Sequence, residues 1–137
     1  MEPRCFFLAG TLLLCLLLQG CNSDDTFAHP PPAALDGEWF AADGTYELSF
    51  LPNNRFSLTE VREDGDATRL TGWAYYPRAG QVSFEFDQRL NICPEIIGVY
   101  TYTRDADTLT FLLVQDDCEV RTKLIPLAWS SSGGGWF

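Results

Sequence analysis

The sequence predicts an all-β domain, folded as an antiparallel up-and-down barrel of about eight strands with one disulfide. Residues 36–129 consist of short segments in which apolar and polar residues alternate, the pattern of strands that bury one face. Turn-forming residues separate these segments, and no amphipathic helix of useful length interrupts them. Because no helix is available to cover an apolar sheet, closure into a barrel removes both the exposed face and the free edges. A β-sandwich is the alternative architecture.

The expected strands follow one another with short connections. They occupy residues 35–40, 45–51, 55–61, 68–76, 81–87, 96–104, 107–115 and 118–129. The clearest alternation lies in residues 81–87. Asn53 and Asn54 predict a tight turn between the second and third strands, because asparagine tolerates the left-handed backbone region. At most one helical turn is expected, between Gln88 and Pro94.

An export signal precedes the β domain. Residues 5–18 form an apolar run too short for a comfortable membrane span, and the small residue Gly20 provides a cleavage site before Cys21. The Leu-Gln-Gly-Cys pattern that ends at Cys21 resembles the lipobox of bacterial lipoproteins at all its defining positions. The resemblance implies that residues 1–20 are removed and that Cys21 carries acyl chains such as palmitate. An ordinary secretory signal followed by a chance cysteine is the alternative.

A tether and a tail are expected on either side of the domain. Residues 21–35 contain three consecutive prolines and predict an extended, lipidated tether. Asn22 differs from the aspartate that retains lipoproteins in the inner membrane in the enterobacterial sorting pattern, so the outer membrane is favoured. Residues 23–25 are similar to acidic surface-export signals, which leaves the membrane leaflet open. Residues 130–137 predict a flexible Ser/Gly tail that ends in two aromatic residues.

The five cysteines divide between the signal and the domain. Cys5 and Cys15 leave with the signal, and Cys21 is used by lipid. Cys93 and Cys118 remain, and an even pair in an exported protein predicts a disulfide. Its closed loop would stabilise the fold by roughly 3–4 kcal/mol in the chain-entropy model. A reactive thiol or a two-cysteine metal site is the alternative.

The strongly acidic composition excludes one class of partner. The chain has 19 acidic and 9 basic residues, a net charge of −10. Removal of residues 1–20 takes away one residue of each sign, so the mature chain keeps this charge. Such a surface repels phosphates, and nucleic acid is therefore not an expected partner. We expect the acyl chains on Cys21, and no basic patch, to hold the membrane.

The sequence offers no set of catalytic residues. The sole histidine, His29, lies in the expected tether, and the domain cysteines are expected to be paired, so a nucleophile and its base cannot be assembled. Acidic clusters at residues 63–66, 105–107 and 116–117 coincide with turns and lack the spacing of a calcium loop. We therefore expect no enzymatic activity, no cofactor and no metal.

Two features resemble the lipocalin-like (calycin) barrels. The first strand of these proteins begins with Gly-x-Trp, which Gly37 and Trp39 match. In that family a late arginine packs over this indole and closes one end of the barrel. Arg121 is suitably placed, so we expect a cation–π contact between Arg121 and Trp39. The chain is shorter than a typical lipocalin and shows no evident C-terminal helix.

The lipocalin-like resemblance implies that the barrel binds a small hydrophobic ligand in its mouth. The candidates to line such a site are large aromatic residues of the expected strands: Trp73, Tyr75, Phe84, Phe86, Tyr100, Tyr102 and Phe111. These side chains can instead fill the interior, because an eight-stranded barrel is only just wide enough for packed side chains. The alternative function is therefore a non-enzymatic, protein-binding envelope module with a solid core. It is similar to the bacterial metalloprotease inhibitors, whose small disulfide-bearing barrel also begins with Gly-x-Trp.

Overall fold

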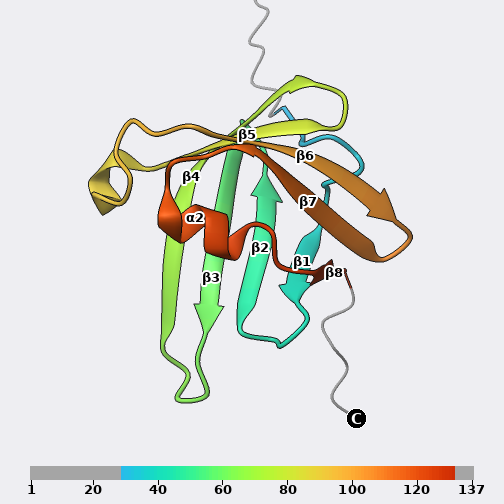
Figure 1. The fold of residues 1–137 in the computed structure, drawn as a ribbon. Helices are drawn as coiled ribbons and strands as arrows, with labels where there is room; N and C mark the ends of the chain where they lie inside the picture. The colour runs from blue at the N-terminus through green and yellow to red at the C-terminus, as the bar shows by residue number, and fades with distance from the viewer. Residues whose placement is uncertain (1–28, 132–137) are drawn as a thin grey trace, which may run out of the picture.

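The computed structural model describes residues 29–131, which form a closed antiparallel barrel of eight strands (Figure 1). The strands are β1 (Glu38–Ala41), β2 (Tyr46–Leu51), β3 (Arg55–Val61), β4 (Ala67–Arg78), β5 (Gln81–Phe86), β6 (Gly98–Asp105), β7 (Thr108–Gln115) and β8 (Trp129–Ser130). Each strand pairs with its neighbours in the chain, and β8 also pairs with β1, which closes the ring. The predicted fold class is confirmed.

Several expectations concern residues outside the described range. The expected signal segment, the expected lipidation site Cys21 and residues 132–137 of the expected tail lie there. Within the described part of the expected tether, Pro31 and Leu35 are buried. The indole N–H of Trp39 donates to the carbonyl oxygen of Leu35 at 3.0 Å. The last residues before β1 therefore pack against the barrel.

β4 is the longest strand and joins the two halves of the barrel. Residues 67–73 pair with β3, and residues 72–78 pair with β5. In Figure 1, β5, β6 and β7 run across one end of β2 and β3. Gly72 lies where the two pairings overlap, and a Cβ atom there would clash with the carbonyl oxygen of Glu85 and the ring of Phe56. Glycine at this position allows the close approach of the neighbouring backbone.

The segment 118–129, predicted as the last strand, contains a helix. It forms α2 (Glu119–Leu124), and only β8 remains extended at its end. The residues of α2 include good helix formers, and Lys123 pairs with Glu119 one turn earlier at 2.6 Å. Pro126 lies just beyond the helix, where proline is common because it cannot continue one. The prediction of a strand here, and of no C-terminal helix, is wrong.

A disulfide ties α2 to the loop between β5 and β6. This loop contains the 3-10 helix η2 (Gln88–Leu90), the one helical turn that the sequence predicts. Cys93, later in the same loop, is bonded to Cys118, the residue before α2, with their Cα atoms 5.5 Å apart. The predicted pairing is confirmed.

The barrel interior is filled by aromatic side chains. Phe84 lies at the centre of this cluster, and its ring centroid is 5.0 Å from that of Phe56. The centroids of Tyr100 and Phe111 lie 5.7 Å and 6.0 Å from the same ring. All three contacts are edge-to-face, a favourable arrangement for aromatic pairs. Trp39 and Trp129 are fully buried in the same core.

Candidate functional site

A buried ion pair closes one end of the barrel. The Arg121 Nε and Nη2 atoms donate to the two carboxylate oxygens of Asp116 at 2.6 Å and 2.7 Å. The hydroxyl of Tyr100 donates to the same carboxylate at 2.7 Å, and the backbone N–H of Cys118 at 2.9 Å. Both ionised side chains are fully buried. Gly98 leaves room for them, since a Cβ atom there would clash with the carboxylate.

The electrostatics of this ion pair favour its charged form. Burial of Asp116 opposes ionisation, but the hydrogen bonds from Arg121, Tyr100 and the Cys118 N–H outweigh it, so the pKa of Asp116 is lowered. Burial and the hydrogen bond to Asp116 raise the pKa of Tyr100. The group lies beside the disulfide and holds α2 against the sheet. The role of this buried ion pair is therefore structural: it stabilises this end of the barrel.

The predicted contact between Arg121 and Trp39 is wrong. The guanidinium carbon of Arg104 lies 5.0 Å from the centroid of Trp39, whereas that of Arg121 lies 5.2 Å from Phe86. The physical reason is the helix: α2 turns Arg121 toward the carboxylate of Asp116, and β6 supplies the cation for the indole. Gly37 precedes β1 with a φ of 115°, in the region that favours glycine.

The seven candidates for ligand lining divide into two groups. Phe84, Phe86, Tyr100, Tyr102 and Phe111 are buried in the interior cluster. Trp73 and Tyr75 lie on the outside of β4, where they are 39% and 40% exposed. Gly72 and Ala74 point inward, and because side chains alternate along a strand, the residues that follow them, Trp73 and Tyr75, point outward. The expectation that Trp73 and Tyr75 line the interior is therefore wrong.

Trp73 and Tyr75 belong to a cluster on the outer surface. Their rings are nearly parallel, with centroids 6.4 Å apart. The Arg55 guanidinium lies 4.4 Å from the Trp73 centroid and makes two hydrogen bonds to Asp87, of 2.8 Å and 2.6 Å. The Thr71 hydroxyl also donates to Asp87. These partners, with Arg55 first, lower the pKa of Asp87.

Two hollows flank this cluster. One, of about 480 Å³, is lined by Arg55, Trp73, Asp87, Gln88 and Arg89. The other, of similar volume, is more apolar and is lined by Asn54, Tyr75, Tyr76, Pro77, Ser83 and Ile97. The buried hydroxyl of Tyr76 has no hydrogen-bond partner within the described residues, and burial raises its pKa. Both hollows lie outside the filled interior.

A second exposed apolar segment lies on β7. Leu112, Leu113 and Val114 are 64%, 50% and 58% exposed. Within residues 29–131, β7 pairs with β6 along its whole length but with β8 only at Thr108 and Leu109. We call residues 112–114 the β7 segment. The sequence contains a signal for it, because the four consecutive apolar residues 111–114 break the alternation of a half-buried strand.

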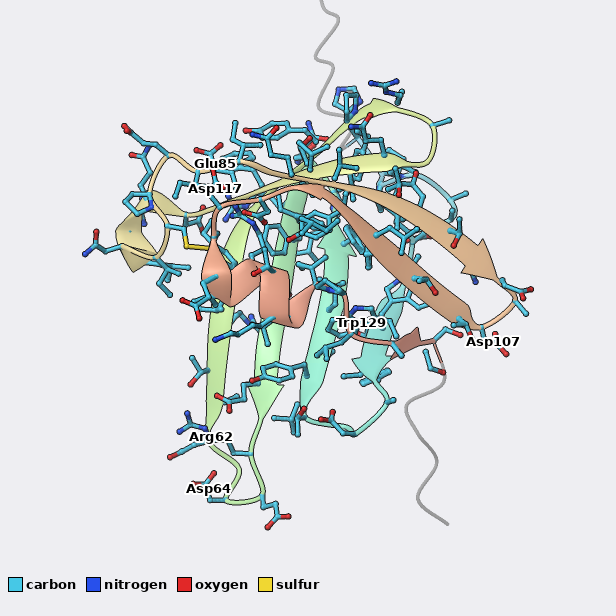
Figure 2. The ribbon with its side chains drawn as sticks, viewed as in Figure 1. Arg62, Asp64, Glu85, Asp107, Asp117 and Trp129 are labelled. Atoms are coloured by element: carbon cyan, nitrogen blue, oxygen red, sulfur yellow. A yellow bond between two sulfur atoms is a disulfide. The ribbon has the colours of Figure 1, made fainter. Side chains whose placement is uncertain are left out.

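Acidic side chains lie at both ends of β7. Asp107 precedes the strand and Asp117 follows it, as Figure 2 shows. Both are exposed, as are Asp105 and Glu119 nearby. The β7 segment is therefore an apolar surface on a strand that has exposed carboxylates before its first residue and after its last.

Neither a metal centre nor a membrane-spanning helix is found among residues 29–131. No three His, Cys, Asp or Glu side chains in this range are placed to share a metal ion. No helix in the same range is long and apolar enough to cross a bilayer. Comparison with family models, curated proteins and solved structures finds no match for this chain.

Proposed function

We propose that this protein is a lipid-anchored envelope protein whose barrel is a non-enzymatic module for binding another protein. The observation that carries the proposal is the contrast between interior and surface. Phe84 and its neighbours fill the space in which a lipocalin-like barrel would hold a ligand, whereas the β7 segment exposes three large apolar side chains. Exposed apolar patches on soluble domains mark interaction sites.

The β7 segment also defines the chemistry of the partner. The side of β7 away from β6 lacks a strand partner beyond Leu109 within the described residues, and such an edge can accept an extended peptide as an added strand. Apolar side chains of the peptide would cover Leu112 and Val114. Lysine or arginine next to them would complement Asp107 and Asp117. The partner is therefore an extended, apolar and basic protein segment.

The anchor is the second part of the proposal. Cys21 carries acyl chains, by resemblance to the lipobox, and the outer membrane is favoured by Asn22. In a Cys21→Ser variant, lipoprotein processing would not remove the signal peptide, and no acyl chains would be attached. Mass spectrometry of the membrane fraction tests this directly: the wild type should give an N-terminal peptide that begins at Cys21 and carries the mass of the acyl groups, and the variant should give no such peptide.

Photocrosslinking tests the partner site. A photoreactive residue at Leu112 or Val114, in intact cells, should give a discrete adduct with one protein. The control position is Thr68, which is exposed at the other end of the barrel, near the β3–β4 turn. Leu112→Asp should abolish the adduct formed from position 114. The proposal fails if positions 112 and 114 give no adduct, or only the adduct that position 68 also gives.

A small apolar ligand is the second candidate function. The hollow lined by Tyr75, Tyr76, Pro77 and Ile97 supports it, since its volume of about 480 Å³ is sufficient for such a molecule. This ligand would lie on the outside of the barrel. Mass spectrometry of solvent extracts from the purified protein tests this candidate, which requires one apolar compound at a stoichiometric amount.

A further inference from the structure

The described chain begins next to an exposed apolar surface. The backbone N–H of Asn53 donates to the carbonyl oxygen of His29 at 2.8 Å, and the N–H of His29 donates to Asn53 Oδ1 at 3.0 Å. Asn53 lies in the turn between β2 and β3. These two bonds fix the point at which the preceding chain joins the barrel, at the opposite end from the β3–β4 turn (Figure 1).

We define the aromatic face by six residues around this point: Leu51, Trp73, Tyr75, Tyr76, Pro77 and Ile97. Leu51 and Ile97 are 41% and 51% exposed. Asn54, which follows Asn53, lines the same hollow as Tyr75 and Ile97. Leu51 is in register with Arg55, whose guanidinium covers Trp73. The aromatic face and the start of the described chain are therefore adjacent.

The chemistry of the aromatic face differs from that of the whole molecule. Its six residues are uncharged, and the carboxylates next to them belong to Glu85, the cross-strand partner of Trp73, and to Asp87, which is paired with Arg55. Tryptophan and tyrosine have an apolar ring with a polar tip, and they gather at the headgroup level of membranes for this reason. Leucine and isoleucine beside them supply surface that gains free energy when it leaves water. The combination suits the interface of a lipid bilayer.

The position of the anchor brings a bilayer within reach of this face. The chain from Cys21 to His29 covers eight residue steps. In any conformation they span at most about 28 Å, since an extended chain covers no more than about 3.5 Å per residue. Acyl chains inserted through Cys21 would hold the barrel at a high effective concentration next to the membrane, so that a weak surface contact suffices.

We propose that the aromatic face lies on the bilayer that holds Cys21, with Trp73 and Tyr75 at the level of the lipid headgroups. This inference rests on the lipid anchor of the proposed function. It places the β2–β3 end of the barrel toward the membrane and the β3–β4 turn away from it.

Quenching by brominated lipids tests the proposal on the full-length, lipidated protein. The vesicles contain phosphatidylethanolamine and phosphatidylglycerol, with or without bromine on the acyl chains near the headgroup. Trp136→Phe removes the tail tryptophan from the signal, while Trp39 and Trp129 are buried. The emission that depends on Trp73 is obtained by difference from the Trp73→Phe variant. We expect the brominated lipids to lower it roughly twofold, as for an indole at the interface.

A matched control places a tryptophan at the far end of the barrel. The variant carries Trp73→Phe and Thr68→Trp, and Thr68 is exposed near the β3–β4 turn. Its emission should not change with bromination. Equal quenching at positions 73 and 68, or none at either in vesicle-bound protein, would overturn the aromatic-face proposal and leave the anchor intact. A wild-type chain that does not float with vesicles would instead refute the anchor, and the orientation with it.

Discussion

Arg121 and Asp116 form a fully buried ion pair, joined by two hydrogen bonds of 2.6 Å and 2.7 Å. The four residues between them in the chain include the half-cystine Cys118, which directly precedes the last helix. The hydroxyl of Tyr100, on β6, also donates a hydrogen bond to the carboxylate of Asp116. The carboxylate of Asp116 thus connects β6, α2 and the disulfide. This end of the barrel is therefore where we first test what stabilises the fold.

Removal of the negative charge should destabilise the protein strongly. Asp116→Asn leaves the guanidinium of Arg121 buried without its counter-ion, and we expect a loss of about 3 kcal/mol or more in the free energy of unfolding. Urea denaturation under oxidising conditions measures it. The matched control is Glu119→Gln, which breaks the exposed pair with Lys123 and should change the stability little. Equal effects of the two substitutions on the free energy of unfolding would contradict a stabilising role of the ion pair between Arg121 and Asp116.

The lowered pKa of Asp116 predicts loss of stability in acid. Its ordinary pKa is about 3.9, and the folded state holds it below that value. The unfolded chain therefore binds the proton first as the pH falls, and the stabilisation is complete above about pH 4 and is lost as the pH falls through the folded-state pKa. Urea midpoints between pH 7 and pH 2.5 should show this decline. In Asp116→Asn the decline should be smaller, with the remainder due to groups such as Asp87.

Loss of the disulfide should weaken the same end of the barrel. Cys93 and Cys118 are 25 residues apart, and a loop of that size predicts a loss of about 3 kcal/mol in the double Cys→Ala variant. The reason is the larger freedom of the unfolded chain. Thermal unfolding of wild-type and variant protein, followed by circular dichroism, measures the difference. An unchanged midpoint would show that the crosslink does not constrain the unfolded state.

Replacement of Arg104 and replacement of Arg121 should lower the free energy of unfolding by very different amounts. Arg104→Ala removes a cation from the face of Trp39 at an exposed site, which costs about 0.5–1 kcal/mol. Arg121→Ala leaves the carboxylate of Asp116 buried and unpaired, which costs about 3 kcal/mol or more. Urea denaturation of the two variants gives the comparison. The opposite order would contradict the importance of the buried ion pair between Arg121 and Asp116.

The alternation of apolar residues was sufficient to predict most of the barrel. β2, β3, β5 and β7 agree with the expected ranges to within a residue or so, because apolar residues recur at alternate positions in each of them. The disulfide followed from cysteine number and export. These features depend on short-range patterns or on composition, which the sequence displays directly.

The parts that failed depend on contacts between distant residues. The sequence of residues 118–124 is compatible with either a strand or a helix. In the structure these residues form a helix, and Arg121 on it pairs with Asp116. Trp73 and Tyr75 are large and apolar, so composition placed them inside. The register of β4 places Gly72 and Ala74 inward instead, and Phe56 and Phe86 already occupy the space beyond Gly72. The β7 segment was visible in the sequence as a break in the alternation.

The most direct test of the central claim is titration of the purified protein with a hydrophobic fluorescent dye, since a filled barrel must act through its outer surface. Wild-type protein should bind the dye weakly, and Leu112→Asp combined with Tyr75→Ser should remove that binding while the free energy of unfolding changes little. Saturable one-to-one binding that survives both substitutions would place the ligand among Phe84 and its neighbours, and would contradict the account.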